Sequence, residues 1–518
     1  MTTQMTENST PASSKSAQPD SSLKRILLIE PPFYRLFKET YSLTRYPLSL
    51  GYLAGTIRER TDWEVMVYNA DFCQEDDPIK TRFLTGAGYE NYLRNLGNLD
   101  RSIWKAIQTT ISEYRPSVIG ITSKSQNYAS AINVARIAKR ISRDMIVVLG
   151  GPHPTLMGGK ILENPDIDIC VRGEGEITLV ELLKAIENHD RIDTIKGISH
   201  RINGKILDNP PREFIGNLDG LCYPHQYAAE ILKNYDQYPR QAFSFVFATR
   251  GCPYDCTFCG SRYVWGRRVR FRSPENIVDE INRLRELGIN TVNFQDDTFG
   301  INKKFLRDLC LAIKSKCPGT TWECEIHVNL VDEENISLMK DAGCEAISLG
   351  IESGNNQILN DIRKNITIEK ALVAADIIKK HDIKLQAFFM VGFPQETEES
   401  LNDTMRAMKK IKADSIIYSI FTPYPGTEAF DFCKEKGLVK DDFDVSLYNH
   451  QSPANCFCMN MALEQFRRGV AEMERLVNRC ERRSAMRVLF SKQGIERIWH
   501  RGPLWSFRYI LDSIQTRQ

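Results

Sequence analysis

The chain has 518 residues, which is too long for a single hydrophobic core, so we expect two or three domains. Its 68 Lys and Arg against 66 Asp and Glu leave a net charge of +2, which excludes a global attraction to nucleic acid or an anionic surface. No apolar run approaches the roughly 20 residues of a membrane span. The fourteen cysteines are scattered along the chain, and the first twenty or so residues are polar and do not resemble a secretion signal. Both observations favour a soluble protein of the reducing cytoplasm.

Residues 1–22 are rich in Ser, Thr, Gln and Pro and are predicted to form a disordered tail. A first α/β domain is predicted over residues 23–208, because apolar strand patterns alternate there with helical patterns such as residues 129–141. This alternation predicts a parallel, doubly wound, Rossmann-like sheet. The expected strands cover residues 24–30, 63–70, 117–122, 145–149 and 167–171.

The loops after these strands meet at the edge of the sheet where such folds bind ligands. Adjacent Gly150 and Gly151 let the backbone approach a bulky ligand, and the prolines around His153 fix the shape of the loop. A Gly-Gly turn between a strand and a helix can equally be structural. The candidate ligand contacts are Ser123, Gly150, Gly151, His153, Gly173 and Glu174.

A Pro- and Gly-containing linker is predicted over residues 209–241, followed by a second α/β domain over residues 242–435. Six strand-helix repeats predict a partial (β/α)6 barrel. Helices are expected to begin after Ser273 and to cover residues 303–316 and 332–342. The expected strands cover residues 243–249, 291–295, 322–327, 346–349, 384–391 and 415–421.

The stretch Gly251–Gly260 places Cys252, Cys256 and Cys259 four and three residues apart, directly after the first strand of this domain. Three thiolates on a four-iron cluster leave one iron open for chemistry, whereas a structural zinc site needs four closed ligands. The alternatives are three buried cysteines or three of four zinc ligands.

Polar residues follow other strands of the same domain. The Gln295-Asp296-Asp297 run offers carboxylates to an ammonium group, and Glu352 is able to accept a hydrogen bond from a ribose. Each residue taken alone also fits a capped helix or a solvated loop.

The C-terminal region, residues 436–518, is predicted to be mainly helical, with an amphipathic helix over residues 462–487. Its last segment carries Trp499, Trp505, Phe507 and Tyr509 among basic residues. A membrane-surface contact, a cap over the active site and a plain packing helix are all compatible with this pattern.

The cysteine motif, with Phe258 before its last Cys, resembles the signature of the radical SAM superfamily. Together with the Gly-Gly-Pro-His and Gly-Glu-Gly-Glu elements, the chain resembles the cobalamin-dependent subclass. The resemblance implies a [4Fe-4S] cluster on Cys252, Cys256 and Cys259, with S-adenosylmethionine (SAM) near Phe258, Gln295, Asp296 and Glu352. It also implies cobalamin at the first-domain loops and an electron donor such as flavodoxin or ferredoxin.

One motif of cobalamin proteins is absent. The Asp-x-His-x-x-Gly sequence that supplies a cobalt-ligating histidine does not occur in the chain. His153 is therefore expected to contact the edge of the corrin, and no histidine is expected on its lower face.

The resemblance implies methylation of an unactivated carbon in a small-molecule or lipid-like substrate. One SAM methylates cobalamin, and a second gives the 5′-deoxyadenosyl radical that activates the substrate. Residues Arg262–Arg268 are expected either to line the substrate pocket or to form a surface loop.

Two other functions are alternatives to methylation. They are oxidative cyclisation of the anaerobic magnesium-protoporphyrin cyclase type and a non-catalytic cobalamin or redox sensor. The methylthiotransferase pattern is set aside, because only Cys73 and Cys170 precede the linker.

Overall fold

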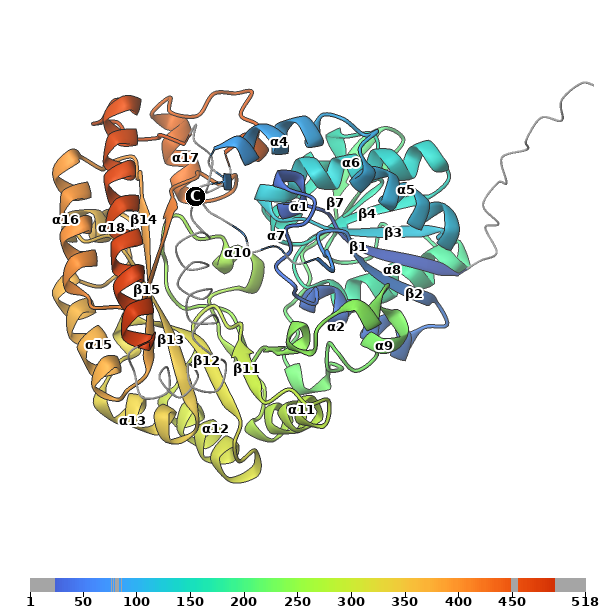
Figure 1. Ribbon diagram of the computed structural model, residues 1–518. Helices are drawn as coiled ribbons and strands as arrows, with labels where there is room; N and C mark the ends of the chain where they lie inside the picture. Colours follow the sequence, from blue (N-terminus) through green and yellow to red (C-terminus); the bar gives the residue numbers. More distant parts are fainter. Residues whose placement is uncertain are drawn as a thin grey trace, which may run out of the picture.

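The computed structural model describes residues 24–75, 77, 79, 83–84, 86–448 and 455–489, which form two α/β lobes lying side by side (Figure 1). The predicted tail and the aromatic segment from Trp499 to Tyr509 lie outside the described residues. Among the helices in the described ranges, none is long and apolar enough to cross a membrane.

A seven-stranded sheet in the order β2-β1-β3-β4-β5-β6-β7 forms the first lobe. The five strands β1 to β5 are parallel, which confirms the predicted Rossmann-like sheet. The strands are β1 (Arg25–Glu30), β2 (Glu64–Asn69), β3 (Val118–Thr122), β4 (Ile146–Gly150), β5 (Ile169–Val171), β6 (Ile198–Ile202) and β7 (Lys205–Asp208).

The antiparallel hairpin β6-β7 was not predicted, although the sequence carries its signal. Asn203 and Gly204 form a two-residue turn with φ of 51° and 76°. Left-handed conformation at both turn positions is what a tight hairpin requires, and Asn-Gly supplies it at little cost. The hairpin pairs with the outer side of β5, so that strand is not left as an open edge.

Helices cover both faces of this sheet. Ile26 and Leu28 of β1 face α2 and α8, whereas Leu27 and Ile29 pack on the opposite side with α5 and α6, as expected from the period-2 alternation of a strand. The helices are α1 (Tyr34–Phe37), α2 (Leu48–Arg60), α4 (Ala87–Leu96), α5 (Ser102–Tyr114), α6 (Tyr128–Ile141), α7 (Pro152–Met157) and α8 (Gly175–Asn188).

Residues 209–241 connect the lobes and pack against the first one. Leu218, Cys222 and Leu232 are buried, and the Lys233 amide donates to the carbonyl of Val67 over 2.9 Å. The segment contains α9 (Ala228–Ile231) and short 3-10 turns. The connection is therefore part of the hydrophobic core.

The second lobe contains a parallel six-stranded sheet in the order β15-β14-β13-β12-β11-β8, which confirms the partial barrel. Ser273 caps α11 as predicted, because its hydroxyl accepts from the Asn276 amide. The strands are β8 (Phe245–Val246), β11 (Thr291–Phe294), β12 (Thr321–His327), β13 (Cys344–Glu352), β14 (Lys384–Val391) and β15 (Ser415–Ile420). The helices are α10 (Ser261–Trp265), α11 (Pro274–Glu286), α12 (Lys303–Lys316), α13 (Glu333–Asp341), α14 (Asn356–Asp361), α15 (Ile368–Lys380), α16 (Glu398–Lys410), α17 (Glu428–Glu435) and α18 (Leu463–Leu489).

The prediction of one strand over residues 243–249 was wrong. The barrel strand is only β8, and the chain leaves the sheet to form β9 (Thr249–Arg250), which pairs with β10 (Arg270–Phe271). The cause is Asp296, whose carboxylate accepts from the amides of Ala248 and Thr249. These amides are then unavailable to a neighbouring strand, so the barrel ladder ends.

The two lobes share one continuous hydrophobic core, which includes Leu50 and Leu182 of the first lobe and Leu349 and Phe389 of the second. The C-terminal helix α18 packs on α16 and β15 along the outside of the barrel (Figure 1). Within the described part of the C-terminal region, α18 is therefore a packing helix, whereas residues 436–448 and 455–462 are irregular apart from the short 3-10 turn Val445–Leu447.

Candidate functional site

A large cavity lies between the lobes, where the carboxyl ends of β1 to β5 face the start of the barrel. Its volume is about 400 Å³. This lies within the roughly 300–1,000 Å³ of ordinary small-molecule pockets. The barrel contributes Phe247, Trp265 and Gln295 to its wall. The cavity therefore offers a site for a ligand held between two protein surfaces.

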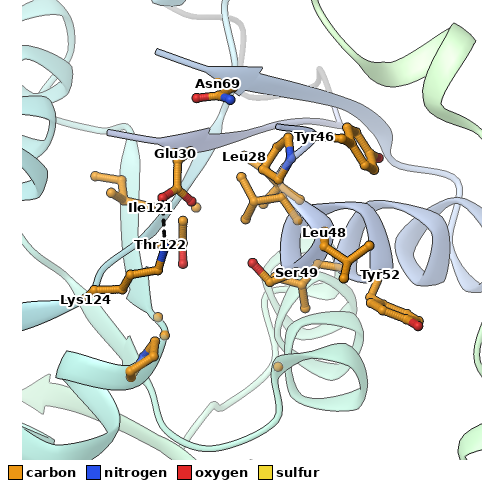
Figure 2. A pocket seen from close by; sticks show the side chains of 18 of the residues that line it. Leu28, Glu30, Tyr46, Leu48, Ser49, Tyr52, Asn69, Ile121, Thr122 and Lys124 are labelled. Carbon is orange, nitrogen blue, oxygen red and sulfur yellow. Dashed lines mark ion pairs between the residues drawn. The ribbon is translucent and has the colours of Figure 1, made fainter. Parts of the chain in front are cut away.

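The floor of the cavity is apolar and its rim is polar. Leu28 and Leu48 lie along the floor, and the Glu30–Lys124 ion pair, 3.7 Å apart, lies at the rim (Figure 2). A corrin ring with amide-bearing edges matches this division. No histidine is among the described residues that line the cavity, so none of them offers an imidazole to cobalt.

Four of the six residues predicted to contact cobalamin line this cavity: Gly150, Gly151, Gly173 and Glu174. Gly151 has φ of 107°, and a Cβ there would stand 2.8 Å from the carbonyl oxygen of Ser123. Only glycine therefore allows the turn to sit this close to the neighbouring loop.

Ser123 and His153 do not line the cavity. Ser123 is fully buried beneath Gly151, and the His153 ring turns to Ser125, 3.0 Å away, and to Tyr128. Burial lowers the pKa of His153 to about 4, so the ring is neutral. The shape of the cavity gives no support to a corrin contact by either residue.

Glu174 has a second role that the sequence did not reveal. Its carboxylate binds Arg250 and Arg270 at 2.8 Å, and Glu176 binds Arg250 at 2.7 Å. The Arg250 guanidinium also lies 5.1 Å from the rings of Tyr52 and Trp265. Burial alone would lower the pKa of Arg250, but the two carboxylates outweigh it and raise that pKa. This buried inter-lobe clamp, formed by Glu174, Glu176, Arg250 and Arg270, fixes the residue just before the cysteine loop.

The three cysteines of the loop are half-buried and form no disulfide. Burial raises the pKa of Cys256 to about 11 and that of Cys259 to about 12. Within the described ranges, no three His, Cys, Asp or Glu side chains gather tightly enough for a single metal ion. A cubane cluster fits this spacing better, because each thiolate binds a different iron.

The cysteine loop is held by segments that the sequence did not single out. The Thr257 amide donates to the Ile362 carbonyl, and its carbonyl accepts from the Ala429 amide, both over 3.1 Å. Asp255 forms ion pairs with Arg262 and Arg363. These contacts fix the loop on three sides before any metal binds.

The residues predicted to contact SAM differ in their surroundings and in their availability to a ligand. Phe258 packs beside Phe393, and Gln295 lies on the cavity wall, where its side-chain oxygen accepts from Arg45 over 3.4 Å. Asp296 instead turns toward the backbone of residues 248–249, and burial raises its pKa to about 6. Its neighbour Asp297 accepts from the Ser261 hydroxyl over 2.7 Å and lies within electrostatic range of Cys252 and Cys259.

Glu352 ends β13 in a left-handed conformation with φ of 69° and accepts from the Lys364 ammonium over 2.8 Å. Glu325, on the neighbouring β12, faces the same space. Its pKa rises to about 7, mainly through burial and then through the charge of Glu352. Neither Lys364 nor Glu325 was found from the sequence, because a lone charged residue carries no motif.

Only part of the Arg262–Arg268 loop lines the cavity. Val264 and Trp265 line the cavity, whereas Arg262 pairs with Asp255 and Glu428.

Filling the cavity should displace a corrin without disturbing the cysteines. Ser49 is exposed on α2 and faces the cavity (Figure 2). We expect Ser49→Trp to lower the cobalamin retained after gel filtration at least fivefold, while iron content stays unchanged. The exposed Ser315→Trp on α12 is the control, and equal retention by both variants would contradict this placement.

The fold and the site define a two-lobed α/β protein with a ligand cavity between the lobes and a three-thiol loop at the start of the barrel. The B12 binding domain family matches residues 35–183, and the radical SAM superfamily matches residues 246–408. An uncharacterized methyltransferase of Pyrococcus horikoshii is 34% identical over 419 residues, covering 80% of this chain and 84% of that protein. The anaerobic magnesium-protoporphyrin IX monomethyl ester cyclase of Rubrivivax gelatinosus is 30% identical over 356 residues, covering 67% and 63%.

Among solved structures, the radical S-adenosylmethionine methyltransferase TsrM from Kitasatospora setae, with cobalamin and a [4Fe-4S] cluster bound, superposes with a TM-score of 0.65. It is 16% identical, covers 88% of this chain and 89% of its own, and so supports the fold. The chain belongs to the radical SAM superfamily, in the group that carries a B12 binding domain. It is an enzyme whose cofactors are a [4Fe-4S] cluster, SAM and cobalamin.

Proposed function

We propose that the protein is a cobalamin-dependent C-methyltransferase that acts on an unactivated carbon. The observation that carries the proposal is a cavity shared by the first-lobe loops, where we place the corrin, and the start of the barrel. A methyl group carried on one side is then within reach of a substrate activated on the other. The methyltransferase relative, which aligns over both lobes, supports the same reaction.

When bound, the cofactors supply a transferable methyl group and a radical that abstracts hydrogen. The chain's own residues bind and orient them. Cys252, Cys256 and Cys259 hold the cluster, and Phe258, Gln295, Asp297 and Glu352 surround SAM. In this proposal Asp297 takes the ammonium role first given to Asp296, because the Asp296 carboxylate is engaged by two backbone amides.

For cobalamin we propose contacts with Gly150, Gly151, Gly173 and the residues of the cavity floor. Apolar side chains there exclude water from the transferring carbon. The inter-lobe clamp keeps the corrin loop and the cysteine loop at a fixed separation.

A second candidate is oxidative cyclisation, because a cyclase relative is 30% identical and this chain spans 63% of its length. Both reactions would use the same cavity, and the products of SAM distinguish them.

We further infer a small-molecule or lipid-like substrate, a low-potential electron donor of the flavodoxin or ferredoxin type, and residence in the reducing cytoplasm. None of the fourteen cysteines is in a disulfide, which suits that compartment. We also propose that the first domain ends at residue 208, the linker at residue 241 and the barrel domain at residue 435.

The test is an anaerobic assay on protein reconstituted with iron, sulfide and cobalamin, given SAM, a strong reductant and candidate substrates. Formation of both 5′-deoxyadenosine and S-adenosylhomocysteine, with a methylated product, supports methyl transfer. Deoxyadenosine alone points to cyclisation. Neither product, with cobalamin still bound, leaves a sensor and overturns the proposal.

A further inference from the structure

The short connection between α14 and α15, residues 362–367, contacts the cysteine loop. Three consecutive residues take part: the Ile362 carbonyl accepts from Thr257, Arg363 pairs with Asp255, and the Lys364 carbonyl lies 3.2 Å from the ring nitrogen of His327. His327 in turn stacks on Tyr254 of the cysteine loop, with ring centroids 3.6 Å apart. The connection therefore touches the loop directly at Asp255 and Thr257 and reaches Tyr254 through His327.

The backbone of this connection is strained. Arg363 and Asn365 both have left-handed φ, of 52° and 57°, on either side of Lys364. Non-glycine residues hold this conformation when the surroundings over-determine it, and such strain clusters at functional sites. Here the result is that the Lys364 side chain points back into the barrel.

The Lys364 ammonium is buried in the barrel, two residues after the Ile362 contact with the cysteine loop. Its side chain is 10% exposed, and its only ion pair in the described part of the chain is with Glu352. A Cβ on Gly350 would stand 3.0 Å from Nζ, so glycine at that position leaves room for the ammonium. The Lys364 charge also opposes the effect of burial on the pKa of Cys256, in keeping with this position.

We propose that Lys364 supplies the positive charge that raises the reduction potential of the cluster bound by Cys252, Cys256 and Cys259. This inference rests on the proposed function only in requiring that cluster. Reduction adds one negative charge to the cluster, and a buried cation nearby stabilises the reduced form. The negative charge of Glu352 lowers the reduction potential of the cluster. The potential therefore depends on the balance between the charges of Lys364 and Glu352.

The test is an EPR-monitored redox titration of reconstituted protein without SAM. We expect Lys364→Met to lower the reduced-to-oxidised ratio at a fixed potential about tenfold, which is 59 mV for a one-electron couple. We expect Glu352→Gln to shift the ratio in the opposite direction, because Lys364 is then unopposed. Lys364→Arg should stay near wild type, and Lys340→Met on the outer helix α13 is the control.

Opposite shifts in the two variants support the electrostatic role. A merely structural role predicts equal loss of cluster in both, or no shift in either, and each of those results overturns the inference. Glu352→Gln keeps the test decisive if Lys364→Met does not fold. Wild-type protein that assembles no cluster would instead overturn the proposed function, and this inference with it.

Discussion

Cys256→Ala is expected to abolish cluster assembly and every SAM-derived radical product while cobalamin remains bound. Cys256 is the central ligand of the loop, and two remaining thiolates cannot hold a cubane that already leaves one iron open. The cavity proposed for cobalamin does not include this residue, so corrin binding should persist. Iron and sulfide content, the visible absorption of the corrin and 5′-deoxyadenosine formation measure the three effects.

Cys480→Ala makes the same chemical change on the half-exposed face of α18 and should retain wild-type cluster content. Turnover by Cys256→Ala at the wild-type rate would mean that the three-thiolate assignment is wrong. Loss of cobalamin together with the cluster would show that the two sites do not load separately.

Arg250→Met is expected to be the most destabilising single change at the interface between the lobes. The substitution leaves Glu176 buried without its ion-pair partner and Glu174 with Arg270 alone. Breaking a buried pair from one side costs about 3–5 kcal/mol. The midpoint of urea unfolding, followed by tryptophan fluorescence, should fall accordingly.

Two further variants separate this effect from general loss of charge. Arg283→Ala breaks the exposed pair with Asp279 on α11 and should cost at most about 1 kcal/mol. The double variant Arg250→Met/Glu176→Gln removes the unpaired carboxylate and should recover part of the loss. An Arg250→Met midpoint within error of wild type would show that the clamp does not stabilise the protein.

Local patterns were enough to predict most of the elements. The strand predicted over residues 384–391 and the helix over 303–316 coincide with β14 and α12. Each has a clear hydrophobic period, and the apolar face that this period predicts is the face that is buried in the structure. The cysteine motif could likewise be found, because its ligands lie within eight consecutive residues.

The rest depends on contacts between residues far apart in the chain. Glu174 and Arg250 are 76 residues apart, and no local pattern shows that they pair. The strand at residues 243–249 breaks because Asp296, 47 residues after Thr249, takes its amide. Lys364 points inward because of a strained connection, which propensity alone does not reveal.

The inter-lobe clamp also connects the two cofactor sites, so any coupling between them must act in both directions. Glu174 belongs to the loop that lines the corrin cavity, and Arg250 precedes Gly251 and the first cysteine. If cobalamin orders this clamp and so favours cluster assembly by some factor, the assembled cluster must tighten cobalamin binding by the same factor, because linkage is reciprocal. Cobalamin affinity measured on cluster-free protein would then underestimate that of the complete enzyme.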